Sequence, residues 1–331
     1  MRRHTPILWF VCAVLMFSVA LLTGCNGNDD RGRRDTEFAY VTDYDGGKVL
    51  RVGLQSHNVV NTIRIGTGSE PISLATNSDH SRVYVANWGA HTVSVINTAN
   101  HAVIDTFNVG SNPHDIALSP DETFLYVANY ADATVSIIDL TTRAITTLNL
   151  TGRPTAVKVH PSGNYAIICT QNSNTLTRLN CTTNTLGTVY PLGSAPIDIA
   201  FNSSGTRGYV PYYNAGTLAV IDTASYTPLT TIPVGINPFG IAITPDNNQV
   251  YVSNMGSGTV SVIATASNSV VNTLNIGTSP SGIDMTPNSQ RACVICQGDN
   301  TIVSIDTFTN TIVDRHFQIG SRPRDIVIVP R

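Results

Sequence analysis

The chain has 331 residues, a net charge of −3 and only 12% charged residues, against about 25% in a typical soluble domain. Its only lysines are Lys48 and Lys158. A weakly acidic chain with two lysines lacks the basic surface that binds a phosphate backbone, so we expect no nucleic-acid partner.

The first 24 residues have the pattern of an export signal. Arg2 and Arg3 precede an apolar stretch, residues 7–22, which ends in Leu22-Thr23-Gly24-Cys25. This ending resembles the lipobox of bacterial lipoproteins, which implies cleavage before Cys25 and lipid attachment to that residue. The alternative is an uncleaved membrane anchor. Both interpretations predict an extracytoplasmic, membrane-bound protein, and Asn26 after the lipid site favours the outer membrane or cell surface.

Residues 25–36 are polar and poor in apolar side chains, which is typical of a flexible tether. The rest of the chain, residues 37–331, shows one unbroken repeat. We therefore expect three parts: the signal peptide 1–24, the lipidated tether 25–36 and a single folded domain 37–331.

The repeat is marked by a proline that follows a glycine-containing turn at intervals of 41–43 residues. These positions are Pro71, Pro113, Pro154, Pro196, Pro238, Pro280 and Pro323. A period of 40–45 residues is typical of β-propeller blades.

One repeat, residues 113–152, holds four short runs rich in β-branched residues, separated by Pro, Asp, Asn, Gly and Thr. Each run predicts a strand and each gap a turn. The sequence thus predicts an all-β fold with four antiparallel strands in each of seven blades.

The two ends of the repeat region complement each other. Residues 38–41 match a second strand with no first strand before it, and residues 325–329 match a first strand with nothing after it. We expect the C-terminal strand to complete the N-terminal blade, so that the propeller is closed three-plus-one.

The sequence motifs within the repeats are also specific. Tyr-Val-Ala-Asn occurs at residues 84–87 and 126–129, Tyr-Val-Ser-Asn at 251–254, and a threonine opens the next strand five residues after each Asn. In these motifs the chain resembles the YVTN family of β-propeller repeat proteins over about residues 37–330. Pro211 replaces the residue before the Asn position in one repeat, and we expect it at a bulge or outside the hydrogen-bond ladder.

Catalytic and metal-binding signatures are weak. We find no nucleophile elbow, zinc-protease motif or phosphate loop, and no two histidines with ligand spacing on one strand. Cys293 and Cys296 fall on opposite faces of one strand, too far apart for one zinc ion or a disulfide. We expect all four cysteines after Cys25 to be buried, no metal and no cofactor.

The strand order places the proline turns and the loops between second and third strands on one face, called here the top face. Candidate binding anchors on it are Tyr44, Trp88, Tyr130, Tyr213, Met255 and Phe239. Exposed aromatic and Met side chains are typical anchors for partners. The alternative is that they fold over neighbouring blades as structural lids.

The residues just after each proline should rim the central channel, because first strands are innermost. The polar ones are Ser73, His114, Asp115, Asp198, Arg324 and Asp325. They form a candidate ligand site, or the aspartates cap loop amides. Farther along the same strands, Lys158 and Asp284 interrupt a ring of mostly alanines, and we expect this pair to meet in or near the channel, directly or through water.

We expect a non-enzymatic binding scaffold, a monomeric propeller presenting its top face to a protein or carbohydrate of the cell envelope. The resemblance agrees, because such repeats occur in surface-layer and envelope proteins. Two alternatives stay open: a lactonase-like hydrolase with its site at the channel mouth, and a propeller subunit of a periplasmic redox complex whose cofactor a partner carries.

Overall fold

The computed structural model describes residues 35–316 and 318–331, and in that part of the chain every regular element is a strand. Cys25 and the predicted signal peptide lie outside the described residues. Asp35 and Thr36, which we expected in the tether, already contact the folded domain: the Asp35 carboxylate accepts hydrogen bonds from the amides of Gln55 and Ser56 at 3.0 and 2.7 Å. Within the described part, no helix has the length and apolarity that crossing a membrane requires.

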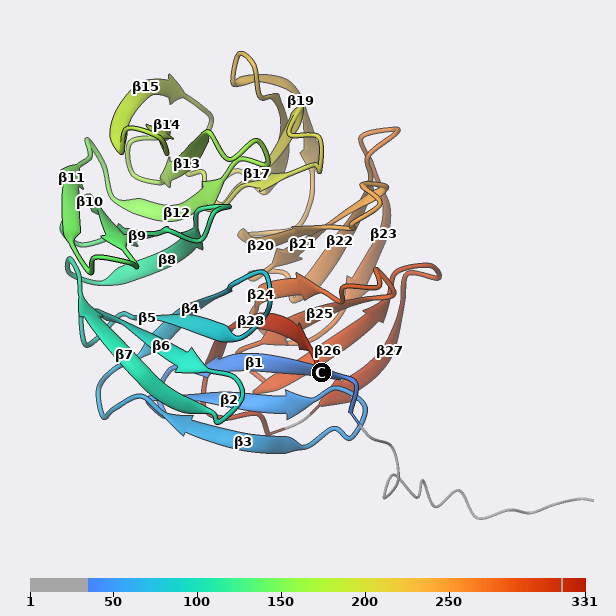
Figure 1. The fold of residues 1–331 in the computed structure, drawn as a ribbon. Helices are drawn as coiled ribbons and strands as arrows, with labels where there is room; N and C mark the ends of the chain where they lie inside the picture. The colour runs from blue at the N-terminus through green and yellow to red at the C-terminus, as the bar shows by residue number, and fades with distance from the viewer. Residues whose placement is uncertain (1–34, 317) are drawn as a thin grey trace, which may run out of the picture. The chain divides into compact units, whose positions relative to one another are not determined.

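The 28 strands form seven four-stranded antiparallel sheets arranged in a ring, with the first strand of each sheet innermost (Figure 1). This confirms the predicted seven-bladed propeller. Blade 2 consists of β4 (Pro71–Thr76), β5 (Arg82–Asn87), β6 (Thr92–Asn97) and β7 (Ala102–Asn108); blade 3 of β8 (Pro113–Leu118), β9 (Phe124–Asn129), β10 (Thr134–Asp139) and β11 (Ile145–Asn149); blade 4 of β12 (Pro154–Val159), β13 (Tyr165–Thr170), β14 (Thr175–Asn180) and β15 (Thr185–Pro191).

The later blades follow the same order. Blade 5 consists of β16 (Ala200–Phe201), β17 (Arg207–Tyr212), β18 (Thr217–Asp222) and β19 (Thr227–Pro233); blade 6 of β20 (Pro238–Ile243), β21 (Gln249–Asn254), β22 (Thr259–Ala264) and β23 (Ser269–Asn275); blade 7 of β24 (Pro280–Met285), β25 (Arg291–Cys296), β26 (Thr301–Asp306) and β27 (Thr311–His316).

Blade 1 combines both ends of the repeat region. Its strand order is β28 (Pro323–Pro330), β1 (Glu37–Asp43), β2 (Lys48–Gly53) and β3 (Val59–Arg64), and β28 pairs antiparallel with β1 (Figure 1). The predicted three-plus-one closure is therefore present.

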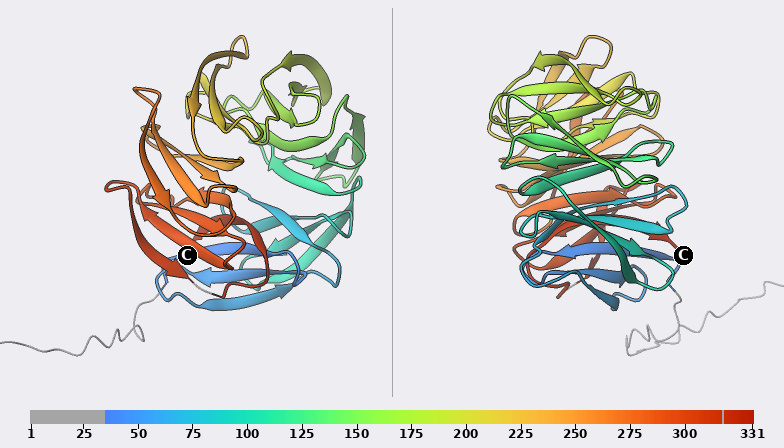
Figure 2. Two further views of the ribbon diagram at one scale, coloured as in Figure 1. Left: turned by 180° about the vertical axis from the view of Figure 1, so that it is seen from behind. Right: turned by 60° about the vertical axis from the view of Figure 1, so that its left-hand side comes forward.

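The apolar core is divided among the interfaces between blades. Each of seven clusters of buried side chains joins two neighbouring blades, because both faces of every sheet lie against another sheet (Figure 2). Cys293 belongs to the cluster shared with blade 1 and Cys296 to the one shared with blade 6, so they lie on opposite faces as expected. Cys181 is only half-buried, in contrast to the prediction.

The recurring Asn of the repeat motif has a structural role. The buried Asn129 amide donates to Thr134 Oγ1 at 3.0 Å and to Ser136 Oγ at 2.9 Å. Asn87 and Asn254 make the same pair of bonds to a Thr and a Ser on the third strand. These bonds tie the second strand to the third, which explains the spacing between the Asn and the following threonine.

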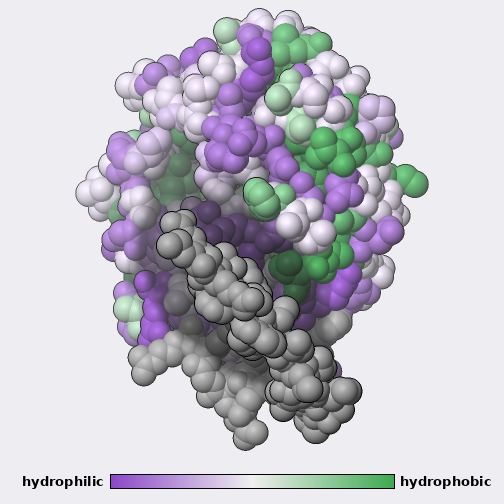
Figure 3. Space-filling view, turned by 90° about the vertical axis from the view of Figure 1, so that its right-hand side faces the viewer, coloured by the Kyte–Doolittle hydropathy of each residue, from purple (hydrophilic) through white to green (hydrophobic). Residues whose placement is uncertain are grey.

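The outer strands carry the exposed apolar residues, among them Leu229, Val271 and Val313. Figure 3 shows one side of the molecule, where apolar residues in green are interspersed with polar residues in purple. Exposed apolar residues are common on protein surfaces.

Blade 5 departs from the others at its inner strand. β16 has two residues, and the chain before it pairs with β17 only through a bridge between Pro196 and Tyr212. The Pro211 carbonyl accepts a bond from the Ile197 amide at 3.2 Å. Because the nitrogen of Pro211 faces the same side and carries no hydrogen, the ladder stops there. The expectation for Pro211 is thus confirmed, and residues 197–199 are released from the sheet.

Candidate functional site

The predicted top face is confirmed by a repeated backbone contact. The amides of Trp88, Tyr130 and Met255, in the loops between second and third strands, donate at 2.9–3.0 Å to the carbonyl of the residue before the proline of the same blade. In most blades the inner strand has a bulge directly after that proline. A bulge places one extra residue out of the ladder, so several consecutive residues face the channel.

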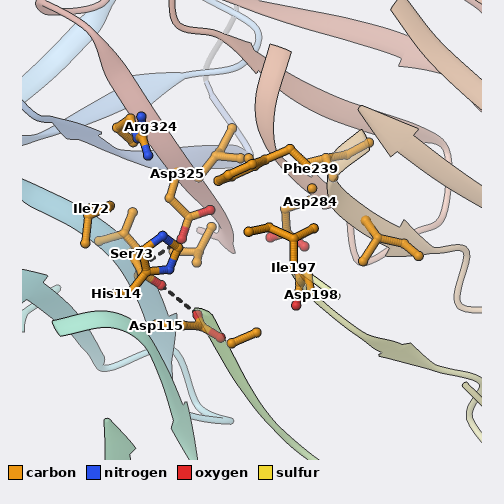
Figure 4. Close-up of a pocket in the computed structure, with 18 of the residues that line it drawn as sticks. Ile72, Ser73, His114, Asp115, Ile197, Asp198, Phe239, Asp284, Arg324 and Asp325 are labelled. Atoms are coloured by element: carbon orange, nitrogen blue, oxygen red, sulfur yellow. Dashed lines mark hydrogen bonds between the residues drawn. The ribbon is translucent and has the colours of Figure 1, made fainter. Parts of the chain in front are cut away.

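The inner strands surround a cavity of about 330 Å³, called here the channel cavity. All six predicted channel-mouth residues line it: Ser73, His114, Asp115, Asp198, Arg324 and Asp325. Lys158, Asp284 and Phe239 line it as well. Figure 4 shows the four aspartates entering it from different blades, so this group of predictions converges on a single space.

Asp115 is the centre of the polar network. Its carboxylate lies 2.8 Å from Lys158 Nζ and accepts hydrogen bonds from Ser73 Oγ at 3.0 Å and from the amide of Val157 at 2.9 Å. Lys158 also lies 3.8 Å from Asp198. We expected Lys158 and Asp284 to meet in or near the channel, directly or through water. Both line the cavity, and no direct ion pair joins them among the described residues. Lys158 pairs with Asp115 instead, because that carboxylate stands on the adjacent blade within reach of its side chain.

Three of the aspartates connect neighbouring blades. Asp115 accepts the Val157 amide of the next inner strand, Asp325 accepts that of Leu74 at 2.9 Å, and Asp284 accepts that of Ile328 at 2.8 Å. These bonds correspond to the capping alternative considered from the sequence. They give the three carboxylates a structural task in addition to lining the cavity.

Asp198 differs from these three. Its carboxylate accepts a bond from the adjacent Ile199 amide at 2.8 Å, and the structure gives it no bond to the next blade among the described residues. The released backbone of residues 197–199 explains this arrangement. Pro211 was therefore the sequence signal that distinguishes Asp198, although its consequence for the channel was not predicted.

Burial controls the ionisation of the cavity. It raises the pKa of Asp198 and of Asp284 to about 7, and that of Asp325 to about 6. Burial by itself lowers the pKa of Lys158, but Asp115 and Asp198 together outweigh it and leave that pKa raised.

The pKa values of the two basic side chains at the top of the cavity are shifted as well. Burial lowers the pKa of Arg324, and burial with the nearby Arg324 charge lowers the pKa of His114 to about 4. The His114 Nδ1 lies 2.7 Å from the Thr155 carbonyl, so a neutral ring donates there and leaves Nε2 as an acceptor.

The raised pKa of Asp284 predicts a pH-dependent stability. In the unfolded chain this carboxyl titrates near 3.8, whereas burial in the folded state raises its pKa to about 7. Between these values the unfolded chain has lost the proton that the folded chain keeps, so this contribution to the free energy of unfolding falls as the pH rises. Asp284→Asn has no proton to lose and still accepts the Ile328 amide. We therefore expect the melting temperature of Asp284→Asn, relative to that of the parent, to increase from pH 4 to pH 7. A difference in melting temperature that does not change with pH would contradict this.

The aromatic top-face residues form local contacts with the cavity rim. The Trp88 ring lies 5.6 Å from Tyr130 and 5.8 Å from His114, between ring centroids. The Arg324 guanidinium lies 5.8 Å from the centre of the Phe239 ring and 5.9 Å from that of Tyr44. All of these aromatic side chains are half-buried.

Tyr213 and Met255 take other positions. Tyr213 lines a separate shallow pocket with Ile236 and Asn237, and the Met255 sulfur accepts a bond from the Gln297 amide at 3.9 Å. Gln297 also accepts a bond from Arg324 at 3.1 Å. Gln297 was not predicted as an anchor, although it directly follows the second strand of its blade, as Trp88, Tyr130 and Met255 do in theirs.

Comparison with known proteins agrees with the repeat and the ring. Residues 66–164 match the family model of the YNCE-like beta-propeller. The chain is a β-propeller repeat protein. A sequence comparison with curated proteins finds no match.

Solved structures similar to this propeller have several functions. The periplasmic gluconolactonase PpgL of Pseudomonas aeruginosa has a TM-score of 0.75 and 17% identity over 88% of this chain and 99% of that chain. A putative 6-phosphogluconolactonase of Bacteroides fragilis has a TM-score of 0.74 and 18% identity, covering 89% and 98%. A chain of hydrazine synthase from Kuenenia stuttgartiensis has a TM-score of 0.71 and 17% identity, covering 80% and 97%. At such identities the likeness shows the fold alone.

Proposed function

We propose that the propeller is a binding module that takes a polar group, such as a sugar unit of an envelope glycan, into the top of the channel cavity. The observation that carries this proposal is the cluster of Trp88, Tyr130 and His114 at the rim of an acid-lined cavity. Aromatic faces and fixed polar groups around one cavity are the usual composition of a small-ligand site.

The chemistry of the rim suits a neutral polyol. Half-buried rings offer flat apolar surface, while Asp198 and Arg324 offer an acceptor and a donor for hydroxyl groups. The volume of about 330 Å³ is at the small end of the range for ligand sites, roughly 300–1,000 Å³. One sugar unit is therefore a better match than a long chain buried along its whole length.

We also propose that the propeller is attached by a lipid at Cys25 and lies outside the cytoplasm as a monomer. The apolar stretch of residues 7–22 and the ending Leu22-Thr23-Gly24-Cys25 support this location. A glycan or protein of the cell envelope is then within its reach. Mass measurement of the chain purified from a bacterial membrane would detect acyl groups on Cys25, and an unmodified Cys25 would contradict the anchor.

The binding test compares the parent chain with the variant Trp88→Ala, Tyr130→Ala, Phe239→Ala on arrays of envelope glycans. Loss of an anchor aromatic costs about 1–3 kcal/mol, which is roughly 5- to 150-fold in affinity. We expect at least a tenfold loss of glycan binding.

Phe308→Ala provides the matched control, because Phe308 is 95% exposed and lies in a turn of blade 7 away from the top face. It should bind as the parent does. Equal binding by the triple variant, once unfolding curves show that it is folded, would make the aromatic residues structural lids. Both chains would also be incubated with envelope extract: a protein retained by the parent and lost by the triple variant would keep the top face as the site and change the class of partner.

A second candidate, a lactonase-like hydrolase, is favoured by Asp198. A carboxyl whose burial raises its pKa to about 7 is suited to act as a general base near neutral pH. Two of the similar structures are named as lactonases. If this candidate is correct, the parent hydrolyses a sugar lactone and Asp198→Asn loses roughly 100-fold or more in kcat, while Phe308→Ala, away from the cavity, keeps the activity.

The third possibility, a subunit of a periplasmic redox complex, stays a prediction. The similarity to a hydrazine synthase chain concerns the fold. Co-purification of a cofactor-bearing partner with the propeller would be the observation in its favour.

A further inference from the structure

Neighbouring blades meet at a recurring contact on the outer side of the ring. In every blade, the turn between the third and fourth strands contains one residue with positive φ: His57, His101, Arg143, Asn184, Tyr226, Asn268 or Asn310. Several of these residues contact the fourth strand of the preceding blade. Arg143 pairs with Asp105 of β7, and the Asn310 carbonyl accepts a bond from Asn272 of β23 at 2.8 Å.

At the junction of blades 7 and 1 this contact is made by His57 and Asp314. The His57 Nε2 lies 2.5 Å from Asp314 Oδ2. Asp314 stands at the same position of β27 as Asp105 in β7 and Asn272 in β23, because each pairs with the fourth residue of the neighbouring third strand. The contact between this turn and the fourth strand of the preceding blade therefore recurs in other blades.

His316 is the unusual member of the junction. It pairs with the second residue of the third strand, Ile302. The residues at this position in the other six blades are Ile63, Phe107, Leu148, Tyr190, Ile232 and Leu274. His316 thus occupies a place that is otherwise apolar or aromatic.

The His316 ring is buried, with 1% of the residue exposed, and neither ring nitrogen has a hydrogen-bond partner among the described residues. Burying a polar group without a partner costs about 1–3 kcal/mol. Such a group in an otherwise apolar position needs an explanation, and a bound ion provides one.

We propose that His57, Asp314 and His316 form a binding site for a divalent transition-metal ion of the Zn²⁺ type. One ligand atom from each residue lies within 4.8 Å of the others, and His316 Nε2 is 3.7 Å from Asp314 Oδ2. Two imidazoles and one carboxylate are a donor set that suits Zn²⁺ and similar first-row ions. Asp314 and His316 are two residues apart on one strand and therefore face the same side.

The surroundings hold these groups in place. Asp314 Oδ1 accepts a bond from the Arg315 amide at 2.8 Å, which leaves Oδ2 toward the two rings. The His57 and His316 ring centroids are 4.4 Å apart at an angle of 63°. The His57 side chain is 38% exposed, so a fourth coordination position is open to solvent and can take water.

A metal ion here would connect blade 7 to blade 1 through side chains. These two blades also meet where the C-terminal strand β28 closes the ring. An ion that binds only the folded chain stabilises it by mass action. The site would therefore strengthen ring closure, independently of any ligand on the top face.

The test uses the chain purified without a histidine tag and treated with a chelator. Titration with Zn²⁺ in a calorimeter should show about one ion per chain, and a saturating concentration should raise the melting temperature by roughly 5 °C. Co²⁺ bound in place of Zn²⁺ should give the visible absorption that is typical of a four-coordinate site. Ca²⁺, which prefers oxygen ligands, should have no effect.

In each of three variants, the new residue is the one that stands at the equivalent position of another blade. His316→Leu and His57→Asn should each abolish Zn²⁺ binding, and we expect the metal-free His316→Leu chain to be at least as stable as the parent because leucine suits the apolar position. His101→Asn changes the same turn position in blade 2 and should leave Zn²⁺ binding unchanged. Failure of the parent to bind Zn²⁺, or binding that survives both His316→Leu and His57→Asn, would overturn the proposal and leave only an ion pair like that of Arg143 and Asp105.

Discussion

Deletion of residues 323–331 is expected to prevent the chain from reaching its folded state. β28 supplies the inner strand of blade 1 and buries the apolar side chains of residues 326–329. Each buried aliphatic side chain contributes about 1.5–3 kcal/mol, so their combined loss is comparable to the whole stability of a typical domain, about 5–15 kcal/mol. The deletion also exposes the edge of β1, which favours aggregation.

Circular dichroism and size-exclusion chromatography of the truncated chain measure this effect. The matched control removes Arg331 alone, which lies after β28 and is exposed, and should remain folded. A synthetic peptide of residues 321–331 added to the truncated chain should restore part of the ordered fraction, because it can pair with β1. A truncated chain that unfolds at the same temperature as the parent would show that closure by β28 contributes little.

Asp115→Ala is expected to destabilise the fold by about 2–4 kcal/mol. Removal of one partner from a buried ion pair costs about 3–5 kcal/mol, but the Lys158 side chain is 35% exposed, and solvent screening reduces the loss. The substitution also leaves the buried Val157 amide, which now donates to Asp115 at 2.9 Å, without its acceptor.

Chemical denaturation at pH 7 of Asp115→Ala, Asp115→Asn and the parent separates these contributions. Asparagine keeps an acceptor for Val157 and removes only the charge, so we expect about half of the loss. Ser73→Ala, which removes the hydroxyl that donates to the same carboxylate, should cost about 1 kcal/mol. If Asp115→Ala is as stable as the parent, the carboxylate belongs to a ligand site and does not hold the blades together.

The sequence was sufficient for the architecture because the relevant signals are local and repeated. The proline interval, the four β-branched runs and the Asn-to-Thr spacing each describe one blade, and strand and turn preferences act over a few residues. The closure was predictable because the N-terminal blade lacks a first strand, whereas the C-terminal end of the repeat region is a first strand without the other three. The channel-mouth residues were predictable for a related reason, since innermost strands must face the axis.

The partners of those residues depended on the tertiary structure. Lys158 and Asp284 were expected to meet in or near the channel, directly or through water, and both line the channel cavity. The close ion pair of Lys158 is with Asp115, because the carboxylate that a side chain reaches depends on blade packing. The release of Asp198 depends on a proline in the next strand, which removes one ladder bond.

The sequence alone determined the number of blades, the strands in each, the closure and the face on which the loops gather, because periodic local preferences decide these features. Only the tertiary structure decided which charged side chains pair, which carboxyls become hard to ionise, and that His57 meets Asp314 and His316 from the opposite end of the chain. Those properties follow from burial and from distances between residues far apart in sequence, and a repeat pattern contains neither.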